Sequence, residues 1–126
     1  MDYVDANILA YAFSSDGLKS EKSRQLLKDH ELVTCTLSLD EVAWKFFKIS
    51  PSLAVSVVRG LQSAPKLSFL PFTRDEFDDF TRLLEHGTAP RDAVHAATAL
   101  KLGCKTIYSE DKDFDKVKGL KRRVPW

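Results

Sequence analysis

The stretch APRDAVHAATALKLGCKTIYSEDKDFD, residues 89–115, has the clearest structural pattern in the chain. Pro90 suits the first turn of a helix, where its missing N–H costs nothing, and small apolar residues follow it at helical spacing. Gly103 stands where this helix would end, because a helix C-terminus favours a residue that tolerates positive φ. Residues 106–108 behind it are typical of a short buried strand. The stretch therefore predicts a helix, a tight turn, a strand and a polar loop.

Strand-like and helix-like segments alternate along the rest of the chain as well. Short apolar runs favour strands at residues 3–4, 32–36 and 67–70, with amphipathic helices between them, and a last short strand is expected to begin at Val124. Strands that alternate with helices form parallel sheets covered on both faces. We therefore expect an α/β protein, a three-layer α/β/α sandwich with a central, mainly parallel four- to five-stranded sheet.

Local patterns also predict how some helices begin. Asn7 is expected to cap the first helix, Ser38 to form a capping box with Glu41 in the third, and Ser52 to cap the fourth. Three aromatic residues of the third helix lie at core spacing and are expected to pack inside rather than stack on nucleic-acid bases: Trp44, Phe46 and Phe47.

Composition limits the class of protein. The chain has 126 residues, 44% hydrophobic and 29% charged, which suits one globular domain with a real core. Its net charge of +1 gives no general sign of nucleic-acid binding. Cys35 and Cys104 lack the spacing of a zinc site and are expected to be buried thiols in a reducing compartment. No signal-peptide pattern and no run approaching the roughly 20 apolar residues of a membrane helix are present, so a cytoplasmic protein without a membrane is expected.

Acidic residues follow the ends of several predicted strands. Asp5 ends the first strand, Glu41 lies in the helix after the second, and Asp92 opens the helix before the fourth. Asp111 and Asp113 come just after that fourth strand. Because the carboxyl ends of parallel strands share one edge of a sheet, these acids are expected to converge. Carboxylates gathered in one cleft repel each other unless a cation neutralises them, and oxygen ligands favour Mg²⁺ or Mn²⁺, which are usual in phosphodiester cleavage.

Each acid also has a purely structural explanation. Glu41 fits a capping box, and Asp92 complements the dipole of its helix. Asp111 and Asp113 fit a solvated loop. Asp5 is the hardest to explain in this way, since a carboxylate between a core strand and an apolar helix is rarely left without a partner.

Polar neighbours of the acids have two explanations each. Asn7 orients Asp5, caps its helix, or does both, and Ser109 either hydrogen-bonds a ligand carboxylate or simply ends its strand. His95 lies three residues after Asp92, hence on the same helix face. It could be a ligand or a general acid, but a half-buried histidine that packs beside the site is the better explanation.

Basic residues outnumber acidic ones eight to four in residues 101–126. Such residues are usually solvated, but beside an acidic metal site they could hold a phosphate backbone. The candidate RNA-binding residues are Arg91, Lys112, Lys116, Lys118, Lys121, Arg122 and Arg123.

Taken together, these motifs resemble the PIN domain family, and the compact size resembles the VapC-type toxins of prokaryotic toxin–antitoxin pairs. The resemblance rests on VDANIL at residues 4–9, the segment 38–41, RDAVHAATALKLG at 91–103 and IYSEDKDFDKVKGL at 107–120. It covers nearly the whole chain and implies one PIN-like domain over residues 1–126.

The resemblance also implies a function. It predicts a Mg²⁺- or Mn²⁺-dependent endoribonuclease acting on single-stranded or structured RNA, commonly a homodimer, and held inactive by a small antitoxin protein when it is a toxin. The implied catalytic and metal-binding acids are Asp5, Glu41, Asp92 and Asp111, with Asp113 as an additional or alternative metal ligand. Asn7 and Ser109 match the supporting polar positions of the family.

Other classes of protein fit less well. A haloacid-dehalogenase-type phosphatase requires a second Asp two residues after the first, where this chain has Asn7. A response-regulator receiver requires paired acids near the first strand end, whereas Asp5 stands alone. A PIN scaffold that binds RNA or protein without cutting remains an alternative, although the four filled acidic positions weigh against it. A housekeeping RNA-processing nuclease also remains open.

Overall fold

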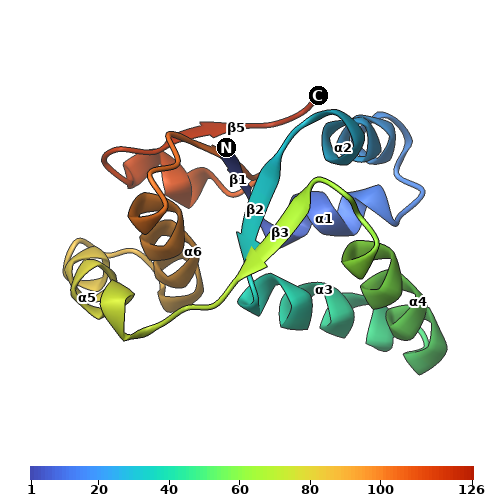
Figure 1. Cartoon of the computed structure of the whole chain (residues 1–126), viewed down its shortest axis with the longest axis horizontal. Coiled ribbons are helices and arrows are strands. Elements are labelled where there is room, and N and C mark those ends of the chain that lie inside the picture. The colour runs from blue at the N-terminus through green and yellow to red at the C-terminus, as the bar shows by residue number, and fades with distance from the viewer.

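The computed structural model describes residues 1–126 and contains one five-stranded sheet in the order β3-β2-β1-β4-β5 (Figure 1). All neighbouring strands are parallel. The strands are β1 (Asp2–Val4), β2 (Leu32–Cys35), β3 (Leu67–Leu70), β4 (Thr106–Tyr108) and β5 (Lys121–Arg123). The predicted sandwich with a central parallel sheet is therefore confirmed.

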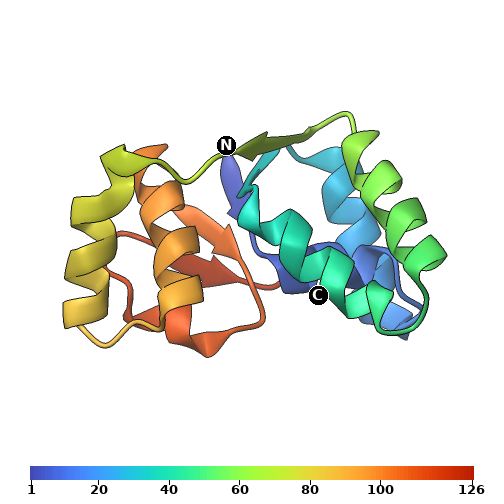
Figure 2. The same cartoon turned by 90° about the horizontal axis from the view of Figure 1, so that it is seen from below.

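Helices cover both faces of this sheet. They are α1 (Ala6–Ala12), α2 (Gly17–Asp29), α3 (Leu37–Phe47), α4 (Pro51–Gln62), α5 (Phe77–Glu85) and α6 (Pro90–Lys101), with 3₁₀ turns η1 (Arg74–Glu76) and η2 (Lys112–Lys116). The pair α5 and α6 lies on one side of the strands, and α1 to α4 lie on the other (Figures 1 and 2). No helix combines the length and the apolar character that crossing a bilayer would require.

Strand side chains alternate between two cores, one on each face. Val4 and Leu32 pack with helices α1 to α4, whereas their neighbours Tyr3 and Val33 pack with α5 and α6. Successive residues of a strand point to opposite faces, so one short strand serves both cores. The two cysteines are buried and unpaired, as expected.

The last strand differs from the prediction. It begins at Lys121 rather than at Val124, and it pairs with β4 through the register Thr106↔Lys121. Its sequence KRR is exposed or half-buried and gives no apolar signal. An edge strand requires a backbone partner on one side only, and charged side chains protect its open side from further pairing.

The predicted cap of α1 is wrong. The residue that caps this helix is Asp5, whose Oδ1 accepts a hydrogen bond from the Ala6 N–H at 2.7 Å. Asn7 lies inside the first turn of the helix. The carboxylate that ends β1 thus also begins α1.

Two further predicted caps are also wrong. Ser38 lies inside α3, and its buried hydroxyl hydrogen-bonds that of Thr34 at 2.6 Å. The helix α4 begins at Pro51 with Ser50 at the capping position, so Ser52 is already helical. Pro51 itself accounts for the earlier start, because its fixed φ suits the first helical position.

The aromatic residues of α3 were expected in the core, and only Phe46 is buried. Trp44 is 59% exposed and Phe47 is 49% exposed. Val42 and Phe46 lie four residues apart and form the buried face of the helix. Trp44 is two residues from each of them and therefore points the opposite way.

Candidate active site

The candidate site lies where the order of the strands reverses, between β1 and β4. In open parallel sheets this switch point forms a crevice at the carboxyl ends of the strands. Asp5 follows β1 and Ser109 follows β4, and the Asp5 N–H donates to the Tyr108 carbonyl at 2.9 Å. Glu41 reaches this edge from α3, and Asp92 reaches it from the first turn of α6.

Asp5 is buried and hydrogen-bonded through both of its oxygens. Its Oδ1 accepts from the Ala6 N–H, and its Oδ2 accepts from the Ser109 hydroxyl at 2.6 Å and from Asn7 Nδ2 at 3.2 Å. Burial raises the pKa of Asp5, and a positive charge on His95 and the hydrogen bond from Ser109 oppose that rise. Asn7 therefore orients Asp5, one of the two roles considered for it.

Ser109 joins the two strand ends through one hydroxyl group. It donates to Asp5 and accepts from the Asp111 N–H at 3.0 Å and from Asn7 Nδ2 at 3.3 Å. A hydroxyl can donate once and accept twice, so Ser109 is used to its full capacity. The orientations of Asp5 and Asp111 are coupled through this atom.

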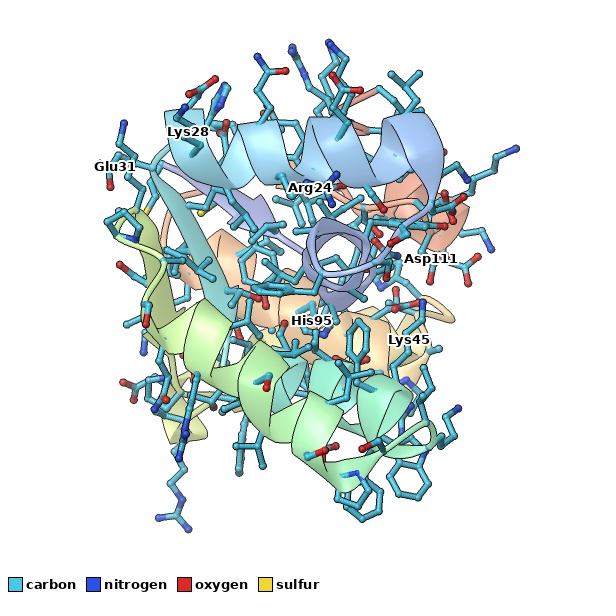
Figure 3. The ribbon with its side chains drawn as sticks, turned by 90° about the vertical axis from the view of Figure 1, so that its right-hand side faces the viewer. Arg24, Lys28, Glu31, Lys45, His95 and Asp111 are labelled. Atoms are coloured by element: carbon cyan, nitrogen blue, oxygen red, sulfur yellow. The ribbon has the colours of Figure 1, made fainter.

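Glu41 has a buried histidine as its partner. Its Oε1 accepts from His95 Nε2 at 2.6 Å, and the same nitrogen is 3.7 Å from Asp5 Oδ1. His95 is 1% exposed and lies in the interior, whereas Asp111 lies toward the edge of the molecule (Figure 3). Burial alone would lower the pKa of His95, but the hydrogen bond to Glu41 and the nearby carboxylates raise it overall. The prediction that His95 is half-buried and only packs beside the acids is therefore wrong.

Asp92, Asp111 and Asp113 form a second group of carboxylates. Each offers an oxygen within 4.8 Å of the others. Burial, followed by the charge of Asp111, raises the pKa of Asp92 to about 7. Asp111 accepts from the Asp113 N–H at 2.9 Å, and Asp113 is exposed, 3.6 Å from Lys116.

All five predicted acids thus lie at one edge of the sheet. They form two groups: Asp5 and Glu41 with His95, and Asp92 with Asp111 and Asp113. The raised pKa of Asp92 reflects burial first and repulsion among carboxylates second, and a divalent cation would relieve that repulsion. Carboxylate oxygens are the ligands that Mg²⁺ and Mn²⁺ prefer, so the donor set fits such an ion.

The predicted RNA-binding residues divide into two kinds. Arg122 is engaged internally: Nε donates to Asp115 at 2.9 Å and Nη1 donates to the Ser109 carbonyl at 3.1 Å. It supports the end of β4. The exposed members of the set are Arg91, Lys112, Lys116, Lys118, Lys121 and Arg123.

A cluster beside the acids, around Glu110, was not predicted from the sequence. Glu110 accepts from the Tyr11 hydroxyl at 2.9 Å and pairs with Lys19 at 2.7 Å. The Lys19 ammonium group also lies 5.1 Å from the centre of the Trp126 ring. The only available signal was that Glu110 directly precedes Asp111. Its partners come from distant helices and from the end of the chain.

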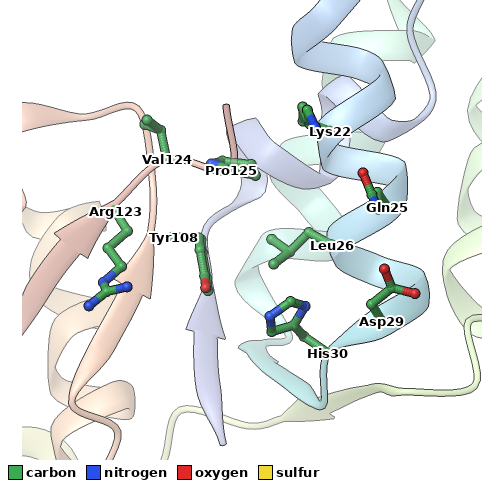
Figure 4. A pocket seen from close by; sticks show the side chains of 9 residues that line it. All are labelled: Lys22, Gln25, Leu26, Asp29, His30, Tyr108, Arg123, Val124 and Pro125. Carbon is green, nitrogen blue, oxygen red and sulfur yellow. The ribbon is translucent and has the colours of Figure 1, made fainter.

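No hollow in the molecule is lined by the five acids; Glu41, Asp92 and Asp111 are half-buried, Asp113 is exposed, and Asp5 is buried. A hollow of about 370 Å³ between α3 and α4 is mostly apolar. Another, of about 260 Å³, lies between α2 and the β4–β5 edge (Figure 4). Its lining mixes basic, acidic and apolar residues: Lys22, Gln25, Leu26, Asp29, His30, Tyr108, Arg123, Val124 and Pro125.

Comparison with known proteins gives a family and a fold. Residues 3–120 match the model of the PIN domain, and no curated protein matches the chain. A toxin–antitoxin complex from Klebsiella pneumoniae is similar at 18% identity over 100% of this chain and 98% of that chain, with a TM-score of 0.75. VapC20 of Mycobacterium tuberculosis, a sarcin–ricin loop cleaving toxin, is similar at 19% identity over 91% and 93%, with a TM-score of 0.75. VapBC2 of Rickettsia felis, bound to a DNA fragment from its promoter, is similar at 19% identity over 98% of both chains, with a TM-score of 0.74.

Proposed function

Because this chain belongs to the PIN domain family, we propose that it is a Mg²⁺- or Mn²⁺-dependent endoribonuclease that hydrolyses phosphodiester bonds of RNA. The observation that carries the proposal is the convergence of acids from β1, α3, α6 and the loop after β4 at the switch point of the sheet. Their position at the edge of the sheet, outside any hollow, supports a polymer substrate, either single-stranded or structured RNA.

The acids differ in their proposed roles as ligands of the ion. In this proposal Asp5, Asp92 and Asp111 hold one ion, and Glu41 completes its shell or belongs to a second site. Asp113 is an additional or alternative ligand. A bound ion would polarise a phosphoryl oxygen and neutralise the charge that develops on the leaving oxygen.

The protein's own groups supply geometry and proton transfer. Ser109 and Asn7 hold one oxygen of Asp5, and Ser109 also fixes the backbone of Asp111. Water attacks phosphorus in line with the bond to the 3′ oxygen, that bond breaks, and a site carboxylate accepts the proton of the water.

We also propose that the chain is the toxin of a toxin–antitoxin pair, neutralised by a small antitoxin protein, and that it forms a homodimer in the cytoplasm. Two of the similar structures are described as a toxin–antitoxin complex and as VapBC2, which supports the first proposal. Apolar side chains of α3 and α4 are exposed, among them Trp44, Phe47 and Val55, and a protein partner would bury them. The unpaired cysteines suit a reducing compartment.

The test is cleavage of a mixed single-stranded RNA by the purified protein with Mg²⁺ or Mn²⁺, with EDTA as control. We expect cleavage that EDTA abolishes and that Asp5→Asn abolishes without a change in fold. A protein that retards RNA without cutting it would instead be a binding module. Cleavage without growth arrest on expression would favour a housekeeping RNA-processing nuclease over a toxin.

A further inference from the structure

A chain of hydrogen bonds runs through the interior from β2 to Glu41. The Cys35 N–H donates to the Tyr3 hydroxyl oxygen at 2.9 Å. That hydroxyl lies 2.6 Å from His95 Nδ1, and His95 Nε2 lies 2.6 Å from Glu41 Oε1. Cys35 and Tyr3 are 0% exposed and His95 is 1% exposed, so no water competes for these groups.

The donors in this chain all point the same way. A backbone N–H can only donate, so the Tyr3 oxygen accepts from Cys35. The acceptor at hydrogen-bond distance from the Tyr3 hydroxyl is His95 Nδ1, at 2.6 Å, and the neutral ring accepts the Tyr3 hydrogen there. A neutral imidazole that accepts at Nδ1 has its hydrogen at Nε2, and a charged imidazolium has a hydrogen on both nitrogens. In either form His95 Nε2 has a hydrogen and donates it to Glu41.

This direction decides between two roles for His95. Its Nε2 lies within 4.8 Å of oxygens of Asp5 and Glu41, an arrangement that could hold an ion. A ring nitrogen that has a hydrogen has no lone pair to offer a metal. The geometry therefore favours a donor to Glu41 over a metal ligand.

Glu41 depends on this donor more than the other acids depend on theirs. Asp5 and Asp111 are held by Ser109 and by local backbone bonds, whereas Glu41 makes no other hydrogen bond. Its side chain is long and 20% exposed, so it would otherwise sample several rotamers.

We propose that His95 is a positioning residue for Glu41 and that Tyr3 fixes the ring of His95. The hydrogen bond holds Oε1 of Glu41 and leaves Oε2 to face an ion. This inference rests on the proposed nuclease function and assigns a role that the ion-binding acids do not fill. Partners that orient metal ligands typically contribute 10- to 100-fold, roughly, to metal affinity or activity.

Two substitutions of His95 separate positioning from packing. In His95→Gln the amide nitrogen reaches the place of Nε2 and keeps a donor for Glu41. In His95→Asn the side chain reaches only the place of Nδ1 and keeps the partner of Tyr3. Both lose the ring, so both should lower the melting temperature. Tyr3→Phe removes only the hydroxyl, and Thr98→Val is the control, because Thr98 is buried in α6 and bonds only the Val94 carbonyl.

The readouts are Mn²⁺ affinity by calorimetry, kcat for RNA cleavage and the melting temperature. We expect His95→Asn to lose roughly 10- to 100-fold in Mn²⁺ affinity or kcat. Tyr3→Phe should also lower Mn²⁺ affinity or kcat. His95→Gln should retain most of the affinity or kcat that His95→Asn loses. Thr98→Val should lower only the melting temperature. Equal losses in His95→Gln and His95→Asn, or losses that simply follow the melting temperature, would overturn the proposal.

A spectroscopic measurement tests the direction of the chain. In ¹⁵N-histidine-labelled protein saturated with Mg²⁺, the Nε2 resonance of His95 should keep its coupling to a hydrogen. Loss of that hydrogen on Mg²⁺ binding would make His95 a ligand and refute the positioning role. If the wild type neither takes up Mn²⁺ nor cuts RNA, the proposed function fails as well. A wild type that does both, with variants that match it, refutes this inference alone.

Discussion

Asp92 and Asp111 stand at opposite ends of one helix-turn-strand unit, yet their carboxylates meet at the edge of the sheet. Each has an oxygen within 4.8 Å of the other, and burial, followed by the charge of Asp111, raises the pKa of Asp92 to about 7. The strand order places the start of α6 and the end of β4 at the same edge, so the fold itself brings these acids together. Repulsion built into the scaffold suits a site for a cation.

This repulsion predicts a pH dependence of stability in metal-free protein. The folded-state pKa of Asp92, about 7, lies above its ordinary value of 3.8, so the folded state binds more protons between these values. Stability contributed by this group must fall as pH rises through that window. Asp5, Asp111 and Asp113 face Asp92 and act in the same direction. Asp92→Asn should therefore gain free energy of unfolding relative to wild type as pH rises from about 4 to about 7.

The measurement is urea unfolding of both proteins in EDTA at a series of pH values. Other carboxylates also make the free energy of unfolding depend on pH, and they do so in both proteins. Subtracting the value of the wild type from that of Asp92→Asn cancels their contribution. Adding Mn²⁺ should stabilise the wild type and reduce that difference. A difference that does not change with pH would contradict the raised pKa of Asp92.

Ser109→Ala removes one hydroxyl group and should lower catalysis or Mn²⁺ affinity as well as stability. The hydroxyl is the shared partner of Asp5 and Asp111, and its loss removes a hydrogen bond from the Asp5 carboxylate and one from the Asp111 backbone. We expect roughly a 10- to 100-fold loss of kcat or Mn²⁺ affinity. The buried partners left unsatisfied should cost about 1–3 kcal/mol of stability. Ser63→Ala, at an exposed hydroxyl that bonds the Arg59 carbonyl, is the matched control and should change neither.

Asp111 and Asp113 should differ in importance. Asp111 is fixed by the bond between its N–H and Ser109, whereas Asp113 is exposed and pairs with Lys116. We expect Asp111→Asn to lower Mn²⁺ affinity by more than the roughly 100-fold that an outer partner can cost. Asp113→Asn should have a clearly smaller effect. Titration of each variant with Mn²⁺ checks this order, and equal losses would mean that both residues are principal ligands.

Arg122 and Lys112 should respond in opposite ways to truncation. Arg122 braces the Ser109 carbonyl and Asp115, so Arg122→Ala should lower the melting temperature. Lys112 is exposed beside Asp111, so Lys112→Ala should weaken RNA binding and reduce the salt slope by about 1 without a loss of stability. Filter binding of RNA to each variant, made in a catalytically inactive protein and measured at several salt concentrations, gives the affinity and the salt slope. Thermal unfolding gives the melting temperature. Loss of the salt slope in Arg122→Ala at unchanged melting temperature would show that Arg122 contacts RNA instead.

Much of the fold and the acid cluster followed from sequence because strong local signals agreed with the global fold. Pro90 and Gly103 bound α6 as predicted, with Pro90 in its first turn and Gly103 at φ 74° just past its end. Placing Asp5 and Asp111 at strand ends was enough to predict that they lie at the same edge, where Ser109 joins them, since parallel strands share their carboxyl edge. This step required no knowledge of side-chain conformation.

What the sequence did not reveal depends on side-chain direction and on distant partners. Tyr3 and His95 are 92 positions apart, and their contact requires Tyr3 to lie on the face of β1 that α6 covers. Trp44 lies on the opposite face of α3 from Val42 and Phe46, and both faces carry apolar residues, so the sequence does not show which one is buried. Lys121 begins a strand that hydrogen-bonds through its backbone, so no apolar pattern could predict it.

The most direct test of a metal site at Asp5 is calorimetric titration of the wild type and of Asp5→Asn with Mn²⁺ near neutral pH. We expect saturable uptake by the wild type that is strongly weakened in Asp5→Asn, while both proteins show the same circular dichroism spectrum. No uptake by the wild type, or equal uptake by the two proteins, would contradict it.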